Sequence, residues 1–125
     1  MVIKRFEDID SWKEGRNLAA KIYAISRKDG FKSDFGLRDQ ICRAVVSISS
    51  NIAEGFESQS NSEFIKFLTY SRRSAAEVKS QLYLALDNGY ISKQEFEELY
   101  QQAAQVSKLL TGFINYLKNN KSRKK

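Results

Sequence analysis

The absence of proline is the feature of this sequence that most restricts its fold. None of the 125 residues is proline, which ends or kinks a helix, and only six are glycine. Four of those glycines, Gly30, Gly36, Gly55 and Gly89, divide the chain into long segments. Long segments separated by short joints are typical of a helical bundle.

Apolar residues recur at helical spacing in each of the four segments. Between Leu37 and Ile52 they follow one another at steps of 4, 3, 1, 3 and 4, which places them on one face of a helix. A strand would require strict alternation instead. We therefore expect four helices and no sheet.

Signals for helix ends support this division. Ser60 precedes Glu63 by three residues, and Ser92 precedes Glu95 in the same way, which is the spacing of a capping box. Gly55 is expected to end the second helix as its C-cap, because glycine adopts the left-handed cap conformation without steric cost.

The predicted fold class is all-α, an antiparallel up-down-up-down four-helix bundle. Three of the helices should exceed twenty residues, or about 30 to 40 Å at 1.5 Å per residue. The bundle is expected to occupy residues 1–117 as one domain. Residues 118–125 are expected to form a basic, disordered tail.

Composition indicates a soluble protein. Hydrophobic residues make up 42% of the chain and charged residues 29%, and no apolar run approaches the roughly 20 residues needed to cross a bilayer. The N-terminal residues lack the apolar centre of a signal peptide. We expect a cytoplasmic protein without membrane contact.

Catalysis is not expected. The chain has no histidine, and Cys42 is its only cysteine, so the commonest general base and the commonest metal ligands are missing. Glycine-rich phosphate loops are also missing. We predict a protein that is not an enzyme and has no catalytic, cofactor-binding or metal-binding residues.

Several polar residues lie close to the apolar stripes of the second and third helices. Glu54 and Glu77 are the carboxylates nearest those stripes. The two alternative interpretations of these carboxylates are a metal site and a structural network of polar side chains. Bundle metal sites pair glutamates with histidines, so the network is the better interpretation. Buried charges persist only when paired. The predicted network consists of Arg43, Asn51, Glu54, Ser74 and Glu77.

The formal net charge of +6 comes mostly from the end of the chain. The last residues supply five cations without an acid, namely Lys118, Lys121, Arg123, Lys124 and Lys125. Such a tail either binds nucleic acid or only keeps the chain in solution, and both interpretations stay open.

The third helix adds a second group of cations. Lys66 and Arg73 are seven residues apart, as are Arg72 and Lys79, which gives two adjacent basic stripes on one lateral surface. The stripes are either a solvated face or a surface that contacts a nucleic-acid backbone without base specificity. These four residues and the tail cations are the nucleic-acid-binding candidates.

Residues 36–55, GLRDQICRAVVSISSNIAEG, fit a signature of the type GL-x-x-Q-I-x-R-A-x-x-S-I-x-x-N-I-A-E-G. On this motif the chain resembles the four-helix-bundle family linked to intervening sequences of bacterial 23S ribosomal RNA genes. The same family includes the accessory variability proteins of diversity-generating retroelements. The resemblance covers roughly residues 6–117. Its polar and glycine positions are Gln40, Arg43, Ser47, Asn51, Glu54 and Gly55.

This resemblance implies a bundle that assembles into a ring-like homopentamer. It also implies RNA or DNA binding through basic outer surfaces in the retroelement members, and it implies no catalytic role. The expected partners are copies of the same chain, RNA or DNA, and a nucleic-acid-handling protein such as a reverse transcriptase. The alternative is a structural or protein-interaction bundle that binds no nucleic acid.

Overall fold

The computed structural model describes residues 3–120 and contains four long helices. They are α1 (Asp10–Ser26), α2 (Phe35–Glu57), α3 (Asn61–Asp87) and α4 (Lys93–Asn119). Two short 3₁₀ turns accompany them, η1 (Phe6–Asp8) and η2 (Phe31–Ser33). The described residues contain no strand, so the predicted all-α, four-helix fold is confirmed. The tail was predicted to begin at Lys118, but α4 continues to Asn119, and residues 121–125 lie outside the described residues.

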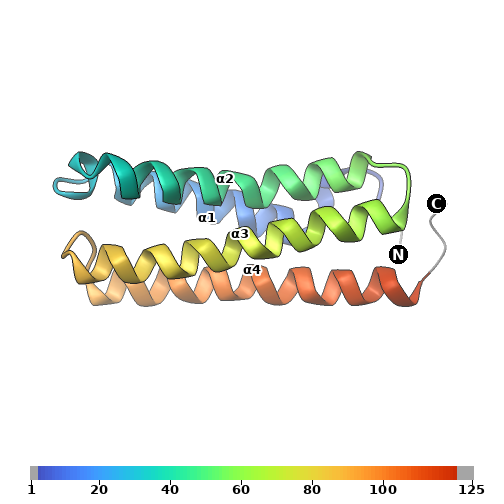
Figure 1. Ribbon diagram of the computed structural model, residues 1–125. Helices are drawn as coiled ribbons and strands as arrows, with labels where there is room; N and C mark the ends of the chain where they lie inside the picture. Colours follow the sequence, from blue (N-terminus) through green and yellow to red (C-terminus); the bar gives the residue numbers. More distant parts are fainter. Residues whose placement is uncertain (1–2, 121–125) are drawn as a thin grey trace.

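The helices lie side by side along one long axis (Figure 1). The α1–α2 and α3–α4 connections are at one end of the bundle, and the α2–α3 connection is at the other. α3 contacts both α2 and α4, and α1 closes the bundle against the same two helices. With 27 residues in each of α3 and α4, the molecule is a rod about 40 Å long. Within residues 3–120, no helix is both apolar and long enough to span a bilayer.

Apolar side chains from all four helices fill the interior. The largest fully buried side chains are Phe31, Leu18, Ile22, Ile41, Ile48, Ile52, Leu68, Leu82, Leu110, Val45, Val78 and Val106. Small residues allow α2 and α3 to pack close together, and one of them, Ser71, forms a hydrogen bond from α3 to α2. The buried hydroxyl of Ser71 donates to the Ile48 carbonyl at 2.7 Å, which satisfies a group that would otherwise be costly to bury.

Local signals determine three of the helix ends as predicted. The Ser60 hydroxyl accepts a hydrogen bond from the Glu63 amide at 3.3 Å, which is one of the two bonds of the capping box predicted there. Ser92 and Glu95 form a complete capping box, with reciprocal bonds of 3.0 and 2.8 Å. α3 ends just before Gly89, whose φ of 74° is in the left-handed region. These bonds supply partners for backbone groups that a helix end leaves unpaired.

The prediction for Gly55 is wrong. α2 continues past it to Glu57, and Gly55 does not have a positive φ. A Cβ atom at this position would lie 2.8 Å from Phe64 Cδ1 and 2.9 Å from Phe67 Cβ. Gly55 is therefore required for the close approach of α3 to α2, and not for a backbone turn.

Candidate nucleic-acid interface

The predicted polar network is only partly formed. Ser74 Oγ donates to Ser47 Oγ at 3.0 Å, and Asn51 Nδ2 donates to the same oxygen at 2.9 Å and to the Ser47 carbonyl at 2.8 Å. These bonds join the middle of α2 to the middle of α3. Sequence reasoning included Ser74 and Asn51 but missed Ser47, although its position in the signature, four residues before Asn51, was an available signal.

The charged members of the predicted network are exposed. Arg43, Glu54 and Glu77 all face solvent, and no ion pair within residues 3–120 involves them. The prediction of buried, paired carboxylates is therefore wrong for the single chain. Their positions lie at the edge of the α2–α3 contact, where long side chains extend past it into water. Arg43 and Glu77 line one open groove there, together with Gln40 and Ser47.

Metal-ligating side chains are scattered along the described chain. Among residues 3–120, no three of the His, Cys, Asp and Glu side chains come together where an ion could be held. Cys42 is half-buried, and its Sγ donates to Ser26 Oγ at 3.6 Å, which ties α2 to α1.

The predicted basic stripes of α3 lie on two different flanks of the helix. Lys66 Nζ is 3.4 Å from Glu63 Oε2, and the Arg73 guanidinium is 5.8 Å from the centre of the Tyr70 ring. These residues share the side of α3 that carries Glu77 and is nearer α2. We call this surface the α2 flank and define it by Lys66, Tyr70, Arg73, Glu63, Glu77 and Leu84 of α3 with Arg43 and Glu54 of α2.

The other stripe contacts α4. Arg72 Nη1 donates to Thr111 Oγ1 at 3.1 Å, and Lys79 Nζ is 5.6 Å from the centre of the Tyr100 ring. Side chains seven residues apart share a helix face, so further α4 residues extend this surface in both directions. We call it the α3–α4 face. Its residues are Arg72, Lys79 and Tyr83 of α3 with Lys93, Phe96, Tyr100, Thr111 and Lys118 of α4.

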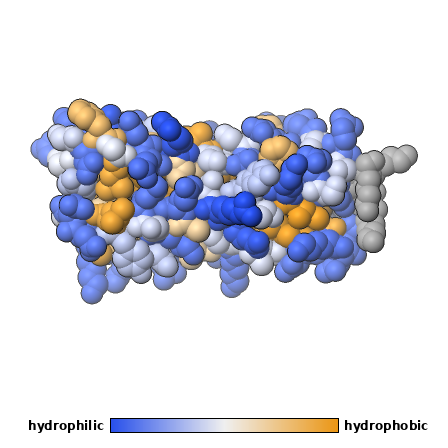
Figure 2. Space-filling model, viewed as in Figure 1, coloured by the Kyte–Doolittle hydropathy of each residue, from blue (hydrophilic) through white to orange (hydrophobic). Residues whose placement is uncertain are grey.

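The two surfaces differ in charge. The α2 flank has cations and acids in equal number, with Lys66, Arg73 and Arg43 against Glu63, Glu77 and Glu54. On the α3–α4 face the cations outnumber the neighbouring acids, with Arg72, Lys79, Lys93 and Lys118 against Asp87 and Glu97. Figure 2 views α2, α3 and α4 from outside and shows a hydrophilic band between orange patches toward the two ends. Of these two surfaces, the α3–α4 face therefore has the excess of positive charge.

Aromatic rings accompany those cations. The Tyr83 ring centre lies 4.8 Å from that of Phe96 and 5.6 Å from that of Tyr100. Tyr83 is 50% exposed, whereas Phe96 and Tyr100 are half-buried. Sequence reasoning did not assign Tyr83 to the site. The available signal was its place four residues after Lys79 and eleven after Arg72 on one helix face.

Two residues with shifted pKa values lie at the end of the bundle with the α1–α2 and α3–α4 connections. Tyr90 donates its hydroxyl to Asp34 Oδ2 at 2.9 Å, and this bond to a carboxylate raises the pKa of Tyr90. Glu95 accepts from Lys28 Nζ and from the Ser92 amide, and these bonds lower its pKa. The Tyr90–Asp34 bond joins the two connections, and the Lys28–Glu95 bond joins the α1–α2 connection to the first turn of α4, so we assign both a structural role.

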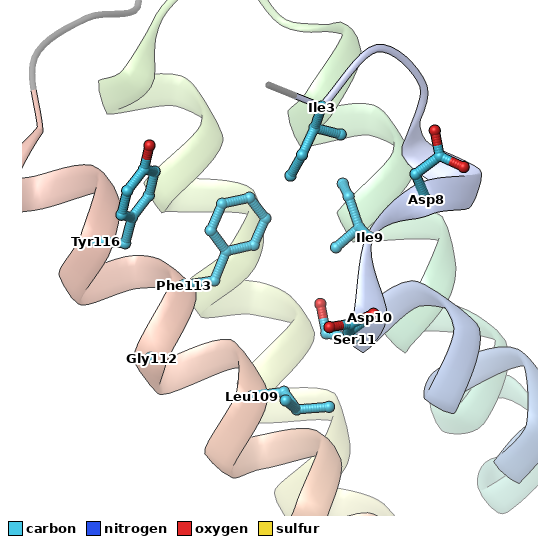
Figure 3. Close-up of a pocket in the computed structure, with 9 residues that line it drawn as sticks. All are labelled: Ile3, Asp8, Ile9, Asp10, Ser11, Leu109, Gly112, Phe113 and Tyr116. Carbon is cyan, nitrogen blue, oxygen red and sulfur yellow. The ribbon is translucent and has the colours of Figure 1, made fainter. Parts of the chain in front are cut away.

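A pocket of about 310 Å³ opens between the start of α1 and α4 (Figure 3). Its walls include Ile9, Leu109 and Phe113, and the Ser11 hydroxyl is buried against it. Ser11 Oγ has no hydrogen-bond partner among the described residues. None of the site residues predicted from the sequence lines this pocket, which lies on the α1 side of α4, away from the α3–α4 face.

Comparison with known proteins agrees with this architecture. The family model described as 23S rRNA-intervening sequence protein matches residues 7–112. The chain is also similar to a crystal structure of a protein of unknown function from the S23 ribosomal protein family of Bacteroides thetaiotaomicron. The identity is 26% and the TM-score 0.77, over 83% of this chain and 97% of that one. A search of curated proteins found no match. Because the family model matches most of its length, the chain belongs to the 23S rRNA-intervening sequence protein family.

Proposed function

We propose that this protein is a non-enzymatic bundle that binds RNA or DNA through its α3–α4 face. The observation that carries the proposal is the excess of cations on that face. Arg72 and Lys79 are positioned by contacts to α4, so their side chains follow the junction between the two helices. Lysine and arginine side chains arranged in this way bind phosphates through charge, without reading sequence.

The basic tail would extend this surface. Lys118 is the last cation of α4, and the sequence continues with Lys121, Arg123, Lys124 and Lys125. The four cations of the α3–α4 face alone would give duplex DNA binding a slope of roughly −3 to −4 in log affinity against log salt. We expect this binding to occur in the cytoplasm, where ribosomal RNA is found.

An electrophoretic mobility-shift assay over a salt series tests the proposal. The double variant Arg72→Gln/Lys79→Gln should weaken binding and reduce the salt slope by about 2. The matched control is Lys13→Gln/Lys21→Gln, which removes two exposed charges from α1. A chain ending at Leu117 separates the contribution of the tail. No shift of wild-type protein at low salt, or equal losses in both double variants, would refute the proposal.

We further propose that the antiparallel bundle assembles into a ring-like homopentamer. The α2 flank supports this assembly, because its charges of both signs are exposed and because Leu84 and Tyr70 are 49% and 39% exposed. A ring contact joins two different surfaces of adjacent copies, and the α2 flank would supply one of them. Light scattering should then give a mass about five times 14.4 kDa. Glu54→Lys should reduce that mass.

A structural or protein-interaction bundle is the second candidate function. The exposed Leu84 and Tyr70 favour it, because apolar groups on a surface are typical of protein contacts. A nucleic-acid-handling protein such as a reverse transcriptase is a partner that fits this candidate. A pentamer that shifts neither RNA nor DNA at low salt would support it over nucleic-acid binding.

A further inference from the structure

Three aromatic rings, those of Tyr83, Phe96 and Tyr100, pack together on the α3–α4 face. Tyr83 packs against Phe96 and meets Tyr100 nearly edge-on, with an angle of 72° between the two ring planes. These contacts hold the ring in place, yet half of Tyr83 remains exposed. A fixed and half-exposed ring offers a flat apolar surface to a ligand at little cost in conformational entropy.

Positive charge lies directly beside these rings. Lys79 precedes Tyr83 by one helical turn, and its ammonium group is 5.6 Å from the centre of the Tyr100 ring. Arg72 continues the same helix face two turns further back. Proteins bind single-stranded nucleic acid with flat aromatic rings next to a line of cations. The bases stack on the rings, and the phosphates pair with the cations.

The other occupants fit this surface less well. A duplex presents phosphates but keeps the faces of its bases stacked inside, so it would use Lys79 and leave Tyr83 in water. An apolar protein surface would cover Tyr83 but would also strip water from Lys79 without pairing its charge. An unpaired nucleotide satisfies both groups at once.

A second tyrosine on α3 has a similar setting, but the charges around it are balanced. Tyr70 is 39% exposed and has the Arg73 guanidinium 5.8 Å from its ring centre. However, Glu63 and Glu77 lie seven residues before and after it, on the same face of the helix. These carboxylates would repel a phosphate, which makes Tyr70 a natural comparison for Tyr83.

We propose that Tyr83, supported from behind by Phe96 and Tyr100, forms a stacking site for unpaired bases, with Lys79 on the adjacent phosphate. The α3–α4 face would then bind single-stranded RNA or DNA in preference to duplex. This inference rests on the proposed nucleic-acid function and adds to it the form of nucleic acid that is bound.

Fluorescence polarisation with a labelled oligouridine and with a hairpin duplex tests the inference. Wild-type protein should bind the single strand more tightly at equal salt. Tyr83→Leu keeps an apolar contact with Phe96 but removes the aromatic face, and it should lower single-strand affinity by about 5- to 150-fold. Duplex affinity and the salt slope should not change. Tyr70→Leu is the matched control. Because Tyr70 lies on the α2 flank, the mass of this variant is first compared with that of wild type by light scattering, and at equal mass it should alter neither affinity.

Photocrosslinking gives a second readout that does not depend on affinity. Iodouracil placed in the single strand should crosslink to the peptides that contain Tyr83 or Tyr100. Equal affinity of wild-type protein for single strand and duplex, or unchanged single-strand affinity of Tyr83→Leu, would overturn the stacking site. If Arg72→Gln/Lys79→Gln still weakens binding in that case, the proposed function stands. Absence of all binding by wild-type protein would overturn both.

Discussion

Gly55 offers a sharp test of how α2 packs on α3. In Gly55→Ala the new methyl carbon would lie 2.8 Å from Phe64 Cδ1 and 2.9 Å from Phe67 Cβ, well inside the 3.5 to 4.0 Å of an ordinary carbon contact. The Cβ of Phe67 cannot move without its backbone. The Phe64 ring is held by Phe113 and Phe56, whose ring centres are 5.2 and 6.2 Å away.

Two opposing effects determine the magnitude. Overpacking of a core contact costs about 1 to 3 kcal/mol, because neighbouring atoms or whole helices must shift. Replacing glycine with alanine inside a helix returns up to about 1 kcal/mol, because the unfolded chain loses freedom. We expect Gly55→Ala to lower the free energy of unfolding by about 1 to 2 kcal/mol.

Gly112 provides the matched control. It lies within α4, and an added Cβ there would meet nothing within 4 Å. Gly112→Ala should therefore raise the free energy of unfolding by up to about 1 kcal/mol. Urea unfolding followed by helical circular dichroism measures both variants, at one protein concentration because assembly would also stabilise the fold. A Gly55→Ala protein as stable as wild type would refute the close-approach argument.

Three further measurements test other parts of the structure. Ser11→Ala should raise the free energy of unfolding by about 1 kcal/mol, because it removes a buried hydroxyl without a partner and introduces a better helix former; a lower thermal midpoint would contradict that placement. Arg43→Ala and Glu54→Ala should each change the unfolding free energy of the single chain by less than about 0.5 kcal/mol in urea titrations at protein concentrations too low for assembly, because both side chains are exposed in the single chain, and a loss of several kcal/mol there would show that they are buried. Lys28 lowers the pKa of Glu95 below its ordinary value of 4.5, so this carboxylate stabilises the fold above pH 4.5 and the contribution is lost as the pH falls through its folded-state pKa. Glu95→Gln should therefore flatten the acid side of the stability profile, and an unchanged profile would show that the Lys28 contact does not form in solution.

The helices and most of their ends could be predicted from the sequence because their causes are local. The capping box of Ser92 and Glu95 involves two residues of the same turn, and apolar periodicity requires only the geometry of one helix. Gly55 could not be assigned in this way. Glycine serves both as a helix cap and at a close contact, and the choice depended on the Phe64 and Phe67 side chains that α3 brings against it.

The candidate site shows the same division. Ser74 and Asn51 were predicted in a polar network because their helical phase points toward the neighbouring helix. The same helical phase led to the prediction that Glu54 and Glu77 belong to a buried network, but both side chains are exposed. Periodicity gives the direction in which a side chain leaves the axis of its own helix. Whether a residue at the edge of a contact is buried depends on how far away the next helix lies.

By itself, the sequence determined an all-α chain, the approximate extent of four helices, and the signature of its family. Only the tertiary structure decided what each helix face meets. Lys66 and Arg73 lie beside the acids of the α2 flank, whereas Arg72 and Lys79 lie against α4 with Tyr100. The four residues look alike in the sequence, because helical spacing fixes the angle of each side chain around the helix axis but does not determine which helix packs opposite it. Packing around α3 separates a charge-balanced flank from a basic, aromatic one.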